Sequence, residues 1–234
     1  MRAVGLGLLV LVFSATALAG IEDLGPATCG SLNNAYGPFD YRTATEEQHR
    51  MVEGAHFLGY IESLKRGKNA VTPGPDIDYT LRVFPNHHRA LLSMMNLSFK
   101  EKREQPIGSN FKIECWMERG ERWRPDDEIV KLLFGTYLLK QGRRGEARVK
   151  LDAADKLISG KGDYSVGPNA LYNLGLAFFM LGDKERALAY AQKAYAQNYP
   201  LPGLRTMLKK AGRWQEARPV AVSSAPAAEA SAAR

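Results

Sequence analysis

Residues 168–200 read PNALYNLGLAFFMLGDKERALAYAQKAYAQNYP, two segments of similar length on either side of a short break. Both halves are rich in apolar and small residues, and Gly182-Asp183 separates them with a tight turn. Gly175 lies in the first half and Ala187 in the second, where two antiparallel helices would approach most closely. Larger side chains at these positions would push the helices apart, because protein interiors are close-packed. The stretch therefore predicts a helical hairpin.

The same pattern of small residues occurs a second time, 40 positions earlier in the chain. Gly135, Ala147 and Ala154 precede Gly175, Ala187 and Ala194, respectively, by that distance. This second copy is DEIVKLLFGTYLLKQGRRGEARVKLDAADKLI, residues 127–158, and its extra length falls in the SGKGDYSVG linker that follows. A recurring unit of this length predicts stacked copies of one hairpin.

Further copies flank these two. Pro125 stands where a preceding repeat would end, so helices over residues 86–100 and 110–122 would form a first copy. Residues 204–217, LRTMLKKAGRWQEA, look like a repeat cut short and predict a capping helix.

The third copy resembles the tetratricopeptide repeat (TPR) family. Its Leu174-Gly175 is followed by Phe178, Ala187, Ala194 and Pro200, in the order of the family signature. The chain departs from that signature at Leu171, where the family usually has Trp. The resemblance implies an all-α fold: a short solenoid of about three TPR-like helical hairpins over residues 86–218, with an irregular N-terminal arm and a C-terminal capping helix.

In this family the first helix of each repeat lines a concave groove that binds extended peptides or helices. The resemblance implies the following inward residues: Arg89, Leu92, Asn96 and Lys100, then Leu132, Thr136 and Lys140, then Tyr172, Asn173, Leu176 and Phe179. The two asparagines can hydrogen-bond a peptide backbone through their amide groups. The three cations favour an acidic segment or a C-terminal carboxylate. Alternatively, some of these residues, the leucines above all, complete the core.

Residues 1–19 have the features of a secretory signal peptide. Arg2 supplies a positive start, residues 4–13 form an apolar run, and Ala17-Leu18-Ala19 fits a cleavage site. We expect cleavage after Ala19 and export, in a bacterium to the periplasm. No later stretch is long and apolar enough to cross a bilayer, so the mature chain is expected to have no transmembrane segment.

The chain is basic, with 32 Lys+Arg against 25 Asp+Glu and a net charge of +7. Such a charge is typical of proteins that bind nucleic acid, an anionic membrane or an acidic partner. Export argues against nucleic acid. The cations are also spread along the chain, which favours solvated helix faces.

Residues 20–85 match no repeat. Residues 20–45 predict an irregular arm whose aromatic residues Tyr36, Phe39 and Tyr41 pack on the body. A helix is expected from Thr45 to Leu64, followed by a long loop over residues 67–85, which contains three prolines. The last segment, residues 219–234, is rich in Pro, Ala and Ser and predicts disorder.

Two adjacent histidines, His87 and His88, open the first repeat after Asn86, which we expect to be the helix N-cap. Neighbouring residues on a helix point in different directions and chelate one ion poorly. The sequence contains no HExxH, CxxC, GxSxG, P-loop or GxGxxG pattern. We therefore expect a structural role, no catalytic residue, no metal and no cofactor.

The chain has two cysteines, Cys29 and Cys115. Because exported proteins usually pair an even number of cysteines, we expect a disulfide that ties the arm to the first repeat.

These observations favour a non-catalytic periplasmic scaffold that binds another protein or peptide. The first alternative is a metal-binding protein or enzyme with its site at residues 67–89. The second is a structural subunit that self-associates through the open ends of its repeats.

Overall fold

The computed structural model describes residues 29–161 and 166–215. Within them all regular structure is helical, so the expected all-α class is confirmed. The helices are α2 (Glu46–His56), α3 (Gly59–Glu62), α4 (Gly74–Val83), α5 (His88–Glu101), α6 (Ile113–Trp123), α7 (Glu128–Lys140), α8 (Arg144–Ser159), α9 (Pro168–Leu181), α10 (Lys184–Ala196) and α11 (Gly203–Lys210). The expected signal peptide (1–19) and C-terminal tail (219–234) lie outside the described residues.

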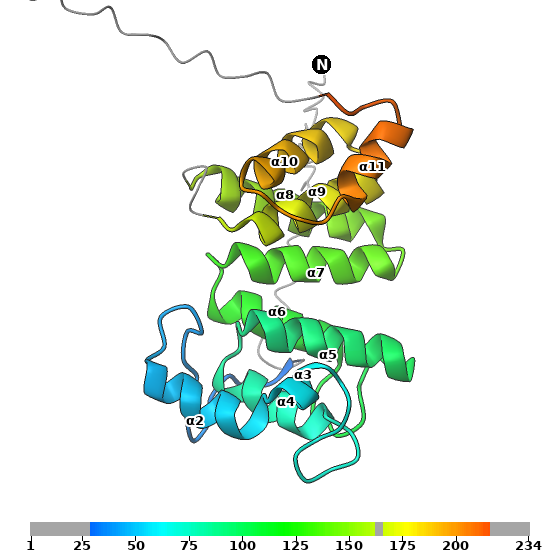
Figure 1. Ribbon diagram of the computed structural model, residues 1–234. Helices are drawn as coiled ribbons and strands as arrows, with labels where there is room; N and C mark the ends of the chain where they lie inside the picture. The colour runs from blue at the N-terminus through cyan, green and yellow to red at the C-terminus, as the bar shows by residue number, and fades with distance from the viewer. Residues whose placement is uncertain (1–28, 162–165, 216–234) are drawn as a thin grey trace, which may run out of the picture.

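The second and third copies form the hairpins α7/α8 and α9/α10 (Figure 1). In each hairpin the predicted glycine lies where the two backbones come together. A Cβ atom on Gly135 would lie 3.3 Å from the carbonyl oxygen of Ala147, and one on Gly175 would lie 3.3 Å from that of Ala187. Gly182 ends α9 in the left-handed conformation, with φ of +86°, which favours glycine.

The hairpins are stacked along the molecule, so that α5, α7 and α9 lie side by side (Figure 1). The second helix of each pair also packs against the first helix of the next: α6 against α7, and α8 against α9. The short helix α11 packs on α9 and α10 at the C-terminal end, as expected of a cap. One continuous hydrophobic core extends from Phe57 to Leu208 through these contacts.

The first pair of helices, α5 and α6, is more open than the other two. Residues 102–112 connect them, whereas three residues, 141–143, connect α7 to α8. Met95, which stands 40 positions before Gly135, is buried on α5. The first pair therefore has no glycine at the position that Gly135 and Gly175 occupy in the other two.

Two expectations for the N-terminal region are wrong. The helix expected over residues 45–64 is broken, since α2 ends at His56 and the short α3 follows. Part of the loop expected over residues 67–85 is the helix α4, whose Ile77 and Leu81 are fully buried. Pro75 lies in the first turn of α4, where a missing N–H group costs no hydrogen bond, so it starts the helix instead of breaking it.

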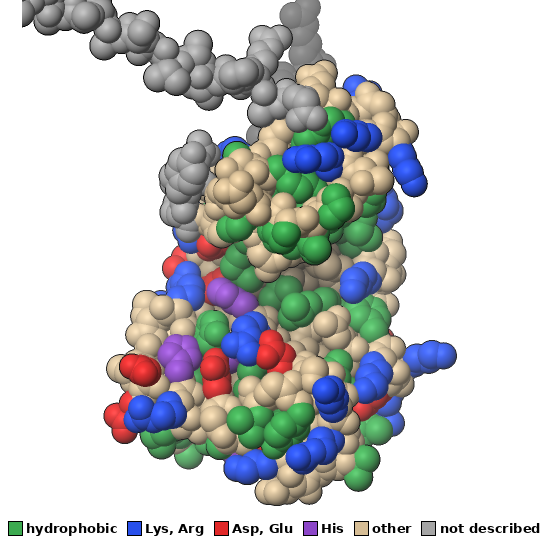
Figure 2. Space-filling view, in the orientation of Figure 1, with side chains coloured by type: hydrophobic (Ala, Val, Ile, Leu, Met, Phe, Trp, Pro, Cys, Tyr) green, Lys and Arg blue, Asp and Glu red, His purple; other side chains and the backbone are tan. Residues whose placement is uncertain are grey.

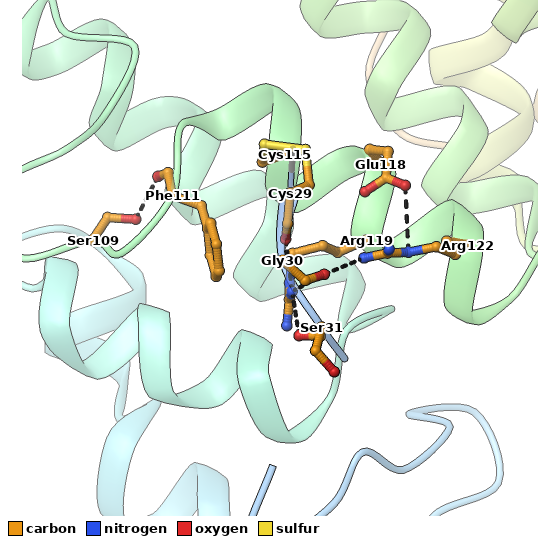
Figure 3. The surroundings of a disulfide bond; sticks show 9 residues. All are labelled: Cys29, Gly30, Ser31, Ser109, Phe111, Cys115, Glu118, Arg119 and Arg122. Atoms are coloured by element: carbon orange, nitrogen blue, oxygen red, sulfur yellow. Dashed lines mark hydrogen bonds and ion pairs between the residues drawn. A yellow bond between two sulfur atoms is a disulfide. The ribbon is translucent and has the colours of Figure 1, made fainter. Parts of the chain in front are cut away.

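The arm is packed onto this region, as expected. Tyr36, Phe39 and Tyr41 contact a small second core of Val52, Val83 and Phe84. The disulfide between Cys29 and Cys115 is confirmed, and it joins the start of the arm to α6. Figure 3 shows Arg119 of α6 donating hydrogen bonds to the carbonyl oxygens of Gly30 and Ser31 beside this bond.

Among the described residues, no helix combines the length and apolar character needed to span a bilayer.

Candidate functional site

A groove of about 540 Å³ runs across the aligned faces of α5, α7 and α9. Its floor is mainly apolar and includes Leu92 and Met95 from α5, Leu132 and Leu133 from α7, and Leu176 and Met180 from α9. The apolar residues recur at steps of three or four on each helix, which places them on one face. The geometry of the stacked hairpins thus aligns three apolar stripes in one concave surface.

Part of this apolar surface is uncovered. Leu92 is 41% exposed and Met180 is 46% exposed, although both lie in the groove. Figure 2 shows hydrophobic side chains gathered in the hollowed middle of this face. Contiguous apolar surface in a concave, polar-rimmed site is typical of a binding site.

Of the residues expected to face inward, seven line the groove: Arg89, Leu92, Leu132, Thr136, Lys140, Asn173 and Leu176. The other four do not. Asn96 is exposed beyond the groove, and Lys100 donates from Nζ to the carbonyl oxygen of Leu64 at 2.6 Å. Tyr172 is buried, and its hydroxyl accepts from the backbone of Leu204. Phe179 lies under Lys184, whose Nζ is 3.5 Å from the ring centroid.

These four residues have other surroundings. Tyr172 points toward α11, which follows α9 in the stack. Asn96 and Lys100 lie near the C-terminal end of α5, beyond the α5 residues that line the groove. The groove residues that the sequence analysis missed, Asn169 and Met180 among them, continue the stripe that includes Asn173 and Leu176, so helical periodicity alone could have found them.

The groove carries less positive charge than its cations suggest. Arg89 is bound to the carboxylate of Glu62, with Nε 2.7 Å from Oε1, and this contact lowers the pKa of Glu62. Lys140 is exposed, and its Nζ lies 5.1 Å from the centroid of the Phe99 ring. Lys140 is therefore the groove cation best placed to meet a ligand carboxylate.

Asn173 offers hydrogen bonds inside the groove. Its side-chain nitrogen donates to the carbonyl oxygen of Asn169 at 2.9 Å. The Oδ1 atom can then accept a hydrogen bond from a ligand, such as a peptide N–H group.

Both adjacent histidines are bound to other side chains, and of the two only His88 lines the groove. His87, and not Asn86 as expected, is the N-cap of α5, because its Nδ1 accepts from the backbone N–H of Ala90 at 3.2 Å. Its Nε2 then carries the proton and donates to Glu53 at 2.8 Å. Tyr41 stacks on the His87 ring, with centroids 3.9 Å apart.

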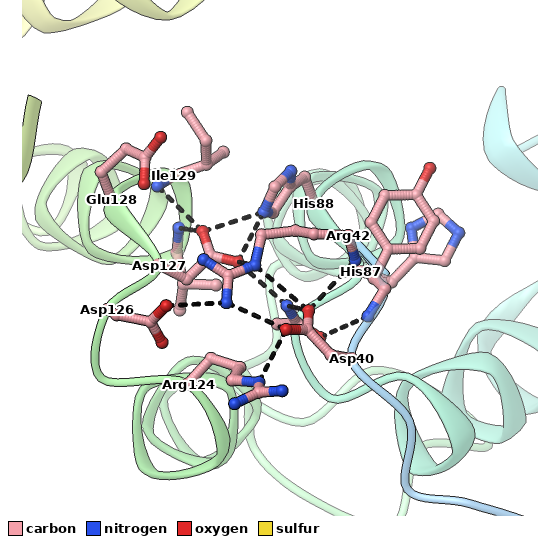
Figure 4. Close-up of polar contacts among 12 residues, drawn as sticks. Asp40, Arg42, His87, His88, Arg124, Asp126, Asp127, Glu128 and Ile129 are labelled. Carbon is pink, nitrogen blue, oxygen red and sulfur yellow. Dashed lines mark hydrogen bonds and ion pairs between the residues drawn. The ribbon is translucent and has the colours of Figure 1, made fainter. Parts of the chain in front are cut away.

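His88 and Asn86 contact the same carboxylate, Asp127, which is the N-cap of α7 (Figure 4). His88 Nε2 lies 2.9 Å from both oxygens of Asp127. Asn86 donates to Asp127 and to Asp40, and it accepts from the backbone of Tyr41. Asn86 thus connects the arm to the starts of α5 and α7, which explains why it is not free to cap α5.

Burial lowers the pKa of His87, and the hydrogen bond to Glu53 only partly opposes that effect. The pKa of Glu53 is lowered by the hydrogen bond from His87. In the described part of the chain, no three histidine, cysteine, aspartate or glutamate side chains are grouped as metal ligands. The arrangement orients helix starts and joins the arm to them.

No protein-family model matches this chain. No curated protein matches it either.

Proposed function

We propose that this protein is a TPR-type scaffold that binds a segment of another protein in the groove of α5, α7 and α9, without catalysis of its own. The observation that carries the proposal is the exposure of Leu92 and Met180 within a concave, mainly apolar surface. Uncovered aliphatic side chains lower the free energy of a complex when a partner removes them from water.

The groove's chemistry suggests the kind of segment it holds. An amphipathic helix or extended peptide would place apolar side chains between Leu92 and Met180. Its backbone N–H groups would meet Oδ1 of Asn173, and a carboxylate would meet Lys140. Because Glu62 already neutralises the charge of Arg89, we expect the groove to prefer a segment with one acidic group over a strongly acidic segment.

Selection from a displayed library of random peptides, with the full chain as bait, tests this function. Selected peptides should share apolar residues at a helical or extended spacing. Leu92→Asp and Met180→Asp should each weaken their binding by at least about tenfold, because a carboxylate would be desolvated against the ligand. Leu201→Asp is the matched control, because Leu201 is 53% exposed and lies outside the groove.

Peptides that bind Leu92→Asp and Met180→Asp as tightly as the unchanged protein would show that the groove is not the binding site. Equal weakening by Leu201→Asp would show a non-specific apolar contact.

We also propose that the protein works outside the cytoplasm, in the bacterial periplasm. The disulfide supports this proposal, because such bonds persist in oxidising compartments. Expression with the native N-terminus, followed by intact-mass measurement, tests it: the mass should correspond to a chain that begins at Gly20, with both cysteines resistant to alkylation. An uncleaved chain recovered from the cytoplasm would contradict the proposal.

A further inference from the structure

Two loops at the far end of the molecule from α11 form one surface (Figure 1). They are residues 63–73, between α3 and α4, and residues 102–112, between α5 and α6. Thr72 Oγ1 donates to the carbonyl oxygen of Ile107 at 3.1 Å. A Cβ atom on Gly108 would lie 2.5 Å from Cγ of Pro75, so the second loop is packed tightly against the start of α4. We call these two loops, together with Lys100, the loop surface.

The loop surface presents two aliphatic side chains to solvent. Val71 is 92% exposed, and Ile107 on the adjoining loop is 49% exposed. Neither residue lines the groove. Branched aliphatic residues that protrude from neighbouring loops favour contact with an apolar phase, since they contribute nothing to the core.

Six exposed cations belong to the same loop surface: Lys65, Arg66, Lys68, Lys100, Lys102 and Arg103. Within residues 29–161 and 166–215, none of them forms a salt bridge. The carboxylate of Glu101 is half-buried and accepts from the backbone N–H of Ile107, and that of Glu104 is paired with Lys112. Six cations against one unpaired carboxylate leave a strongly positive surface. Figure 2 shows lysine and arginine side chains gathered over this lower part of the molecule.

We propose that the loop surface binds the surface of an anionic phospholipid bilayer. Val71 and Ile107 would enter the headgroup region, while the six cations would contact lipid phosphates. Protruding aliphatic tips within a ring of flexible cations suit a flat, fluid anionic surface, since each long side chain can find its own phosphate. A folded acidic protein would need a shaped counterpart for the convex loops, so the bilayer is the better fit. The proposal does not depend on the groove.

Sedimentation with lipid vesicles tests the proposal, with the full chain and at low ionic strength. The protein should bind vesicles that contain phosphatidylglycerol and should bind pure phosphatidylcholine vesicles much more weakly. Added salt should release it, because the charges involved are exposed to screening. Equal binding to both kinds of vesicle would overturn the proposal.

Two sets of variants test the role of the cations. The first replaces Lys65, Lys68, Lys102 and Arg103 by Gln. Each cation near an anionic membrane contributes about fivefold, so partitioning should fall at least about a hundredfold. The matched control replaces Arg144, Arg148, Lys209 and Lys210 by Gln, which are also exposed and remove the same charge. Equal loss in the two sets would show a net-charge effect and overturn the proposal.

A fluorescent reporter tests the insertion of the loop tips. Val71→Trp should shift tryptophan emission to the blue on vesicles with phosphatidylglycerol, relative to the unchanged protein, whereas Leu201→Trp should not. All variants carry the same residues 1–28, so any binding by that segment is common to them. Sedimentation of Val71→Trp with unchanged emission would place the contact elsewhere and overturn the proposal. Far-ultraviolet circular dichroism confirms that each variant is folded.

Discussion

Replacing Gly135 by Ala tests the close approach of the two helices of a hairpin. The new Cβ would lie 2.6 Å from Cγ of Leu151 and 3.3 Å from the carbonyl oxygen of Ala147. Both neighbours belong to the fully buried part of α8, so the strain costs about 1–3 kcal/mol. Alanine favours a helix over glycine by about 0.5–1 kcal/mol. The net expectation is a destabilisation of about 1 kcal/mol.

Gly54→Ala is the matched control for this variant. Gly54 is exposed on α2, and a Cβ there would meet no atom within 4 Å. Only the propensity gain applies, so this variant should be about 0.5–1 kcal/mol more stable than the unchanged protein. Urea unfolding followed by circular dichroism measures both free energies of unfolding.

The difference between the two variants, about 2 kcal/mol, measures the steric contact alone. If Gly135→Ala raised the unfolding midpoint as much as Gly54→Ala does, the backbones would not approach at Gly135, and the reasoning from the small residues would be refuted.

Three further outcomes are expected. Replacing Cys29 and Cys115 together by Ser should lower the free energy of unfolding by up to about 4.6 kcal/mol, because the bond closes a span of 86 residues in the unfolded chain. An unfolding midpoint that does not change when reductant is added would contradict this prediction. His87 has a lower pKa when folded than when unfolded, so stability should be complete above about pH 6.5 and fall below it, as the unfolded chain takes up the proton first. His87→Asn should remove most of this loss of stability below about pH 6.5 while retaining a cap oxygen. An unchanged dependence of stability on pH would assign it to another group. Arg119→Met leaves the buried carbonyl oxygen of Cys29 and the partly buried one of Ser31 without this donor, so it should cost about 1–3 kcal/mol in urea unfolding. A cost near zero would mean that the disulfide alone fixes the arm.

Much of the fold is readable from local spacing. The 40-residue offset between Gly135 and Gly175 predicts two hairpins, and the structure has both. The pairing of Cys29 with Cys115 agrees with the small and even cysteine count, because two cysteines allow a single pairing within the chain. Residue spacing and cysteine number can be read without knowledge of distant contacts, so these features can be predicted from the sequence.

The candidate site was predictable only in part. Positions such as Leu92 and Leu132 follow from applying one repeat register to successive helices, and both line the groove. Lys100 and Tyr172 do not, because Lys100 is bound to Leu64, which follows α3, and Tyr172 to Leu204 of α11. Positions carried over from one repeat to the next do not include the segments that pack on the first and last repeats.

The helical class, the two close hairpins and the cysteine pair could be predicted from the sequence, because each depends on residue spacing or number. Which groups cap the helices, and which cations remain available, depends on contacts made in the folded chain. His87 caps α5 because Asn86 is held by Asp40 and Asp127, residues that lie 46 and 41 positions away in the chain. The charge of Arg89 is likewise neutralised by Glu62, which lies far from it in the sequence. Hydrogen-bonding groups pair with groups that are close in space, and the fold brings together residues that are distant in the chain.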